Sequence, residues 1–170
     1  MEVRVVPAVE AVVEPVLRGM LVEAASDAAL CDATYLPYNL AYDEVSSWVA
    51  GRPGHAWALF EGATPVGWWE IAPVSDTCGF AVPQDTWERE VWLLAEARGR
   101  RVVQRATNLL LPSLRDLGVG HLLGVAWSEN AASIRGMAND GFVLLGEGWW
   151  GSAEDGGLCT VGLKSLSVAS

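Results

Sequence analysis

The sequence predicts a single α/β domain, of the α+β kind, in which helices pack on a mixed sheet. The chain has 170 residues, which fits one domain that needs no disulfide or metal to hold its core together. Apolar residues make up 51% and charged residues only 19%, a composition that excludes a disordered chain. Short apolar or β-branched runs also alternate with segments in which apolar residues recur at helical spacing.

Prolines and glycines divide the N-terminal half into elements. Pro7 ends the first strand, and Gly51 with Pro53 stops a short helix. A tight Gly-Ala-Thr link at 62–64 joins two strands into a hairpin. In chain order we expect a strand over 3–6, a helix over 10–25, an irregular tyrosine-bearing stretch over 26–42, a helix over 43–50, and strands over 55–61 and 65–72.

The C-terminal half alternates strands and helices more regularly. Pro112 interrupts the longest helical pattern, and Gly118 supplies its stop. In chain order we expect a long loop over 73–86, a strand over 88–95, a helix over 102–117, a strand over 121–127, a helix over 130–139, and strands over 142–150 and 158–163.

Charge is distributed unevenly along the chain. The formal net charge is −10, which argues against extended nucleic-acid binding. Residues 1–97 carry 4 arginines and 15 acidic residues, whereas residues 98–170 carry 7 basic and 6 acidic residues. Four arginines fall within eight positions: Arg98, Arg100, Arg101 and Arg105. A local cationic spot on an acidic chain predicts one small anionic ligand.

The sequence also bears on compartment and metals. We see no basic segment followed by an apolar run at the start, and no apolar run of about 18 residues, so neither a signal peptide nor membrane association is expected. Cys31, Cys78 and Cys159 lie far apart and form no CxxC or Cys/His cluster, so no metal site is expected. We therefore expect a reduced, cytoplasmic protein.

Two segments together indicate what the chain binds. Residues 90–103 form a strand, an arginine-rich turn and a helix start, and residues 128–133 (Ser-Glu-Asn-Ala-Ala-Ser) lead into a helix that ends at Gly141-Phe142. The first resembles the Arg/Gln-x-x-Gly-x-Gly/Ala loop of the GCN5-related N-acetyltransferase (GNAT) family, and the second is similar to that family's Asn-containing helix. The resemblance is close over residues 90–142. Elsewhere the chain agrees with the family in the order of its helices and strands. It implies one GNAT-like acyltransferase domain over 1–170, with a largely antiparallel sheet of about seven strands and helices on both faces.

The resemblance implies acetyl-CoA or another acyl-CoA as the acyl donor. The turn suits a pyrophosphate on physical grounds too, because the N–H groups at a helix start lack partners and arginines add positive charge. In the family the pantetheine arm pairs with the preceding strand, and the asparagine helps to hold it. The implied donor-binding residues are Leu93, Leu94, Ala95, Arg98, Gly99, Arg100, Arg101, Val102, Val103, Asn130 and Ser133.

The sequence departs from the family in two places. Arg101 and Val103 stand where the family has small residues, and glycine there lets the backbone approach phosphate oxygens. Met137 stands where many members carry a tyrosine that protonates the leaving thiolate, and a thioether cannot donate a proton. Tyrosines of the 26–42 stretch could substitute for it only if their loop reaches the site.

A carboxylate is expected to take the proton from the attacking amine. Glu90 resembles the position of a catalytic glutamate in some family members, and Glu70 lies beside Trp68 and Trp69, with Glu129 as a third choice. The alternative for each of these glutamates is an ordinary carboxylate at a strand edge that faces water. Aromatic rings next to carboxylates also suit an organic cation, with ordinary sheet packing as the alternative.

We therefore expect an N-acyltransferase that moves an acyl group from a CoA-type thioester to an amine of a small molecule. The backbone N–H of Leu94 or Ala95 would polarise the thioester carbonyl. Two alternatives stay open. One is the same fold using an aminoacyl-tRNA or a carrier-protein thioester, and the other is a non-catalytic GNAT-like binding module. Extended nucleic-acid binding is not expected, and a homodimer is an open alternative.

Overall fold

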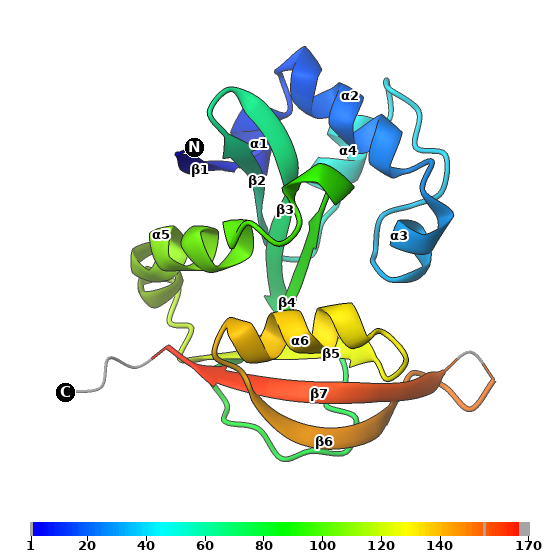
Figure 1. The fold of residues 1–170 in the computed structure, drawn as a ribbon, viewed down its shortest axis with the longest axis vertical. Helices are drawn as coiled ribbons and strands as arrows, with labels where there is room; N and C mark the ends of the chain where they lie inside the picture. Colours follow the sequence, from blue (N-terminus) through cyan, green and yellow to red (C-terminus); the bar gives the residue numbers. More distant parts are fainter. Residues whose placement is uncertain (1, 155, 167–170) are drawn as a thin grey trace. The chain divides into compact units, whose positions relative to one another are not determined.

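The computed structural model describes residues 2–154 and 156–166 (Figure 1). Its contacts divide the chain into two compact units, residues 1–71 with 90–110 and residues 72–89 with 111–170. The strands are β1 (Val3–Pro7), β2 (His55–Glu61), β3 (Thr64–Pro73), β4 (Thr86–Leu93), β5 (His121–Trp127), β6 (Val143–Trp150) and β7 (Gly157–Ser165). The helices are α1 (Ala8–Ala11), α2 (Pro15–Ala24), α3 (Ala28–Asp32), α4 (Val45–Ala50), α5 (Val102–Asp116) and α6 (Ala131–Asn139), with a 3₁₀ turn at Ala95–Ala97.

The described residues form a seven-stranded sheet in the order β1-β2-β3-β4-β5-β7-β6. β4 and β5 pair in parallel, whereas β1–β2, β2–β3, β5–β7 and β6–β7 pair antiparallel. The predicted mixed, largely antiparallel sheet is thereby confirmed. In the part of the chain that the structure describes, no helix is long and apolar enough to cross a membrane.

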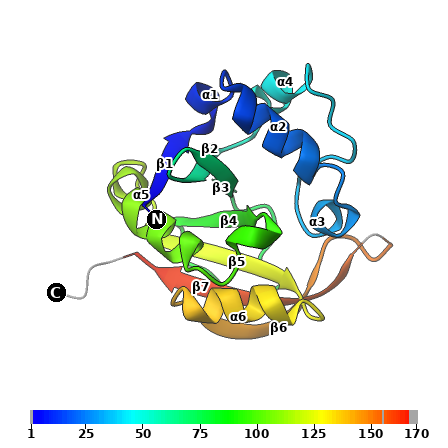
Figure 2. The same cartoon turned by 45° about the horizontal axis from the view of Figure 1, so that its top comes forward.

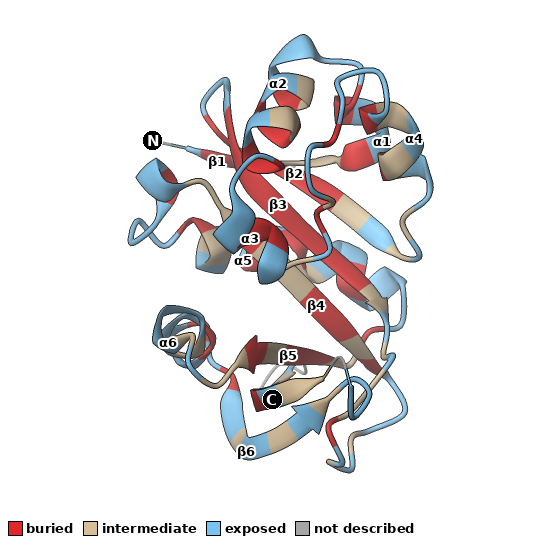
Figure 3. Ribbon diagram, turned by 90° about the vertical axis from the view of Figure 1, so that its right-hand side faces the viewer, coloured by how far each residue is buried: buried red, intermediate tan, exposed pale blue. Residues whose placement is uncertain are grey.

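The core of the first unit lies between β2–β3 and the N-terminal helices. Leu17 and Leu21 of α2 recur at helical spacing and are fully buried, together with Phe60 and Trp68 from the strands. Figure 2 shows α1, α2 and α4 next to β1–β3, and Figure 3 shows β2 and β3 as mostly buried. This packing gives β3 a rigid support.

Gly67 fixes how β3 meets the end of β4. A Cβ atom at this position would lie 2.4 Å from the Trp92 carbonyl oxygen, so no larger residue fits. The Leu94 N–H donates to the Val66 carbonyl at 2.9 Å. The backbone just before the predicted donor-binding turn is therefore held against a buried strand.

The second unit has its own apolar core and one buried ion cluster. Cys78, from the loop before β4, packs with Leu123, Cys159 and Val161 of β5 and β7. Asp140, at the end of α6, pairs with Arg89 and Lys164, which accounts for these buried charges.

The structure corrects the predicted elements at three places. The helix expected over 10–25 is two helices, because Pro15 has no N–H to continue the first and instead begins α2. The stretch expected to be irregular contains α3, whose first turn is capped by Asp27 accepting from the Leu30 N–H at 3.2 Å. β4 ends at Leu93, two residues early, because the chain then enters the 3₁₀ turn.

Candidate active site

The turn between β4 and α5 exposes the predicted donor-binding arginines. Residues 98–101 are all exposed, and the chain reverses through two left-handed residues, Gly99 at φ +73° and Arg101 at φ +58°. α5 begins at Val102, and the Arg105 N–H donates to the Arg101 carbonyl at 3.1 Å. The unpaired N–H groups of a 15-residue helix therefore follow directly on an exposed cationic turn, an arrangement that favours a bound anion.

Glu61, at the end of β2, forms ion pairs with two arginines of this region. Its carboxylate is buried, and Oε2 lies 2.6 Å from Arg100 Nη2 while Oε1 lies 3.1 Å from Arg105 Nη2. Arg105 also donates to the Arg100 carbonyl at 3.0 Å. One buried carboxylate thus orients two of the four arginines, and nothing in the local sequence pattern indicates this role for Glu61.

Arg98 folds back toward the strand. Its Nε donates to the Leu93 carbonyl at 3.1 Å, which ties the turn to the last residue of β4. Arg98 is itself an exposed residue.

The two departures from the family pattern differ in kind. Arg101 has a left-handed backbone, which costs a non-glycine residue about 1–2 kcal/mol. A small residue at that position in the family therefore has a backbone reason. Val103 is the second residue of α5, so only the bulk of its side chain, and not its backbone, sets it apart from glycine.

Glu70 is buried and fully engaged. Its two oxygens accept hydrogen bonds from Arg52 Nε at 3.0 and 2.9 Å, from Arg52 Nη2 at 2.7 Å, and from Trp68 Nε1 at 2.9 Å. Trp68 and Trp69 are themselves fully buried. The tryptophan pair is therefore core packing, and Glu70 anchors a cation from the same chain.

Glu90 lies next to the same arginine and is more accessible. Its Oε1 accepts from the Tyr35 N–H at 3.1 Å, and its Oε2 lies 3.9 Å from Arg52 Nη2. The Glu90 side chain is 14% exposed, against 3% for that of Glu70. The structure therefore brings both predicted carboxylates to one guanidinium.

Arg52 is the functional candidate that sequence reasoning missed. Its guanidinium carbon lies 5.2 Å from the ring centre of Trp48 and 5.5 Å from that of Tyr35. The aromatic rings and carboxylates predicted to surround an organic cation are present. The cation that they surround is the guanidinium of Arg52. Its position after the Gly51 helix stop gives no local signal of this role.

Of the two backbone donors considered for the thioester carbonyl, one is already used. The Leu94 N–H donates to Val66, as described above. Ala95, the first residue of the 3₁₀ turn, is exposed. Ala95 is therefore the better candidate.

The second predicted motif lies in the second unit. Asn130 is the N-cap of α6, and its Oδ1 accepts from the Ser133 N–H at 3.1 Å. Gly141 ends the helix in a left-handed conformation at φ +86°. Met137 is buried. Local capping thus explains Asn130 and Gly141, and a donor-binding role for Asn130 and Ser133 stays a prediction.

The cysteines offer no nucleophile. Burial raises the pKa of Cys78 to about 12 and that of Cys159 to about 11.

His121 pairs with Asp85 at 2.8 Å, and His55 stacks on Trp57. Within residues 2–154 and 156–166, no group of three His, Cys, Asp or Glu could hold a metal ion.

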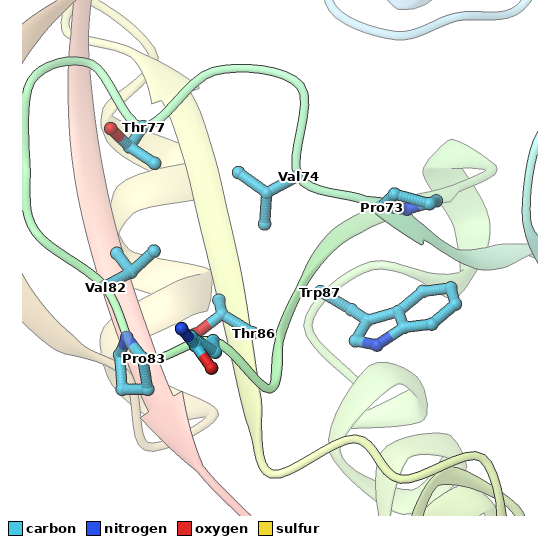
Figure 4. A pocket seen from close by; sticks show the side chains of 8 residues that line it. Pro73, Val74, Thr77, Val82, Pro83, Thr86 and Trp87 are labelled. Atoms are coloured by element: carbon cyan, nitrogen blue, oxygen red, sulfur yellow. The ribbon is translucent and has the colours of Figure 1, made fainter.

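An open recess of about 490 Å³ lies within the second unit. Figure 4 shows Pro73, Val74, Thr86 and Trp87 among the side chains that line it. None of the residues that line it carries an acidic or basic side chain.

Solved structures decide the fold. An acetyltransferase of the GNAT family from Streptococcus pneumoniae matches with a TM-score of 0.68 and 14% identity, over 98% of this chain and 100% of that one. This chain has the GNAT fold. A ribosomal-protein-alanine N-acetyltransferase from Brucella melitensis matches this GNAT fold at TM-score 0.68 and 18% identity, over 97% and 99% of the two chains. An aminoglycoside acetyltransferase in complex with coenzyme A matches at 0.70 and 14%, over 96% and 95%. No family model and no curated protein matches the sequence.

The GNAT fold confirms the resemblance that the two motifs carried. In this GNAT fold the first motif is the end of β4, the turn 98–101 and the start of α5, as its strand–turn–helix reading predicted. The second motif is the capped helix α6, which is followed by Gly141 and the buried Phe142.

Proposed function

We propose that residues 1–170 form one N-acyltransferase domain, which transfers an acyl group from a CoA-type thioester to an amine of a small molecule. The observation that supports this best is the exposed arginine turn directly before α5 in a GNAT fold. Acetyl-CoA, or another acyl-CoA, is the donor. Titration with CoA and acetyl-CoA should raise the Tm, and thiol release should follow addition of an amine acceptor. Absence of both effects would reject the proposal.

The donor is held by groups of the turn. Arg98 and Arg100 bind its phosphates, together with the N–H groups of Val102 and Val103 in the first turn of α5. The backbone of 93–95 borders its thioester arm. When bound, acyl-CoA supplies an activated acyl group. The Ala95 N–H donates to the carbonyl oxygen where negative charge develops.

Glu90 takes the proton from the amine, in preference to Glu70. A general base must lie within hydrogen-bond reach of the amine, directly or through one water. The oxygens of Glu70 are used by Arg52 and Trp68, so protonating it would break a buried ion pair. Glu90 accepts the Tyr35 N–H, and its side chain is 14% exposed, against 3% for that of Glu70.

The pH profile of kcat/KM should lack the decrease at high pH that a catalytic tyrosine acid produces. Met137 has no acidic proton, so the thiolate leaves without help from α6. We expect kcat/KM to rise with pH as the base loses its proton and to show no fall near pH 10, about where a tyrosine ionises. A fall that disappears when Tyr35, Tyr38 or Tyr42 is replaced by Phe would contradict this.

Val103→Gly should tighten donor binding at a small cost in stability. Removing the branched side chain opens the start of α5 to phosphate, and glycine destabilises a helix by about 1 kcal/mol. Calorimetric titration with CoA and chemical denaturation check the two effects. If the variant is as stable as the parent and binds CoA no better, the first turn of α5 does not approach phosphate.

Glu61→Gln should weaken donor binding without altering the chemical step. The amide cannot neutralise Arg100 and Arg105, so the turn loses its fixed orientation. We expect the KM for the donor to rise by about tenfold, as for one charge-assisted hydrogen bond, with kcat nearly constant. Glu2→Gln, an exposed carboxylate, is the control. Equal KM values for the two variants would remove Glu61 from this role.

A further inference from the structure

The Arg52 guanidinium is held rigidly before any acceptor binds. Three hydrogen bonds to Glu70 use Nε and Nη2, and Trp68 fixes the second oxygen of that carboxylate. Trp48 and Tyr35 lie beside the guanidinium. Because Glu70 and Trp68 belong to β3 and Trp48 belongs to α4, the direction of the guanidinium N–H groups is set in advance.

One end of this guanidinium is not used by these contacts. Among the described residues, none of the hydrogen bonds or ion pairs of Arg52 involves Nη1. The side chain is 12% exposed, so it is not sealed in the core. A guanidinium has five N–H donors in a fixed fork, and an anionic oxygen is the natural partner for those of Nη1.

The separation of charges indicates which anion fits. Arg52 Nη2 lies 3.9 Å from Glu90 Oε2, so a cationic and an anionic group are presented side by side. An acceptor that uses both needs its amine and its own anion close together. Standard bond lengths put the amine nitrogen of an α-amino acid about 2.5 Å from its carboxyl carbon, whereas added methylene groups increase that distance.

We propose that the acceptor is an α-amino acid, whose carboxylate binds Arg52 Nη1 while its amine lies at Glu90. This inference rests on the proposed function, because it names the substrate class of the same site. Glu70 is then a positioning residue that acts through Arg52. The rings of Trp48 and Tyr35, 5.2 and 5.5 Å from the guanidinium carbon, add apolar surface beside the cation that pairs with the carboxylate.

The first test changes the ligand and leaves the protein intact. The twenty α-amino acids and their carboxamides are compared by saturation-transfer NMR and calorimetry with CoA-saturated protein. We expect at least one amino acid to bind about tenfold or more tightly than its amide and than its β-homologue, as for one charge-assisted hydrogen bond. If no amino acid binds better than its amide, the proposal is wrong.

The second test removes the cation without leaving a buried charge behind. Arg52→Gln alone strands the buried Glu70 and can unfold the chain, so the double variant Arg52→Gln/Glu70→Gln is used, with circular dichroism as the folding check. We expect amino acid and amide to bind it equally, while CoA affinity is unchanged. Discrimination that persists in the folded double variant overturns the role of Arg52. Amino acid binding without CoA binding or acyl transfer would instead reject the proposed function.

Discussion

Replacing Glu90 by Gln is expected to lower kcat by about 10²–10⁴-fold, the usual contribution of a general base. Glutamine has the size of glutamate, and its amide oxygen can still accept the Tyr35 N–H that Glu90 Oε1 accepts at 3.1 Å. It cannot take up a proton. Donor affinity should be nearly unchanged, because the turn 98–101 does not depend on this carboxylate. Steady-state kinetics and calorimetric titration with CoA measure the two quantities.

A matched control separates the base from general charge effects. Glu96→Gln removes an exposed carboxylate from the 3₁₀ turn and should leave kcat unaltered. A Glu90→Gln enzyme with full activity would remove Glu90 from the mechanism. If Glu70→Gln then loses activity, the role passes to Glu70, provided that circular dichroism shows the Arg52 pair has not unfolded.

The second large effect is expected from replacing Arg98 and Arg100 together by Ala. Each removes a charge-assisted hydrogen bond to phosphate, worth about 1.5–3 kcal/mol, so the Kd for CoA should rise by about 10²-fold or more. The dependence of Kd on salt should flatten, because fewer charges pair on binding. The fold should survive, since Glu61 keeps its contact with Arg105 at 3.1 Å.

Arg115→Ala provides the comparison for this double variant. Arg115 lies in the last turn of α5 and is exposed, so its loss changes net charge without changing the turn. We expect its Kd and salt dependence to equal those of the parent. Donor affinity that is the same in all three proteins would show that the arginine turn is a solvated surface.

Local sequence determined most of the elements and the arginine turn at 98–101. Strand and helix periods, Pro7, Gly51 and Gly118 placed most elements, because these signals act between residues a few positions apart. The strand–turn–helix reading of 90–103 held for the same reason. The predicted helix boundaries were wrong where local signals competed, as at Pro15, which begins a second helix, and at Asp27, whose cap allows the short α3.

Only the tertiary structure decided how the charged residues are paired. Arg52 and Glu70 are 18 positions apart, and Arg105 and Glu61 are 44 apart, yet each pair meets in an ion pair whose carboxylate is buried. An ion pair has no sequence period, and its partners are chosen by strand register and packing. For that reason the sequence could name Glu70 and Glu90 as candidate bases, but only the fold shows that Glu70 anchors Arg52 and that Glu90 is the more exposed of the two.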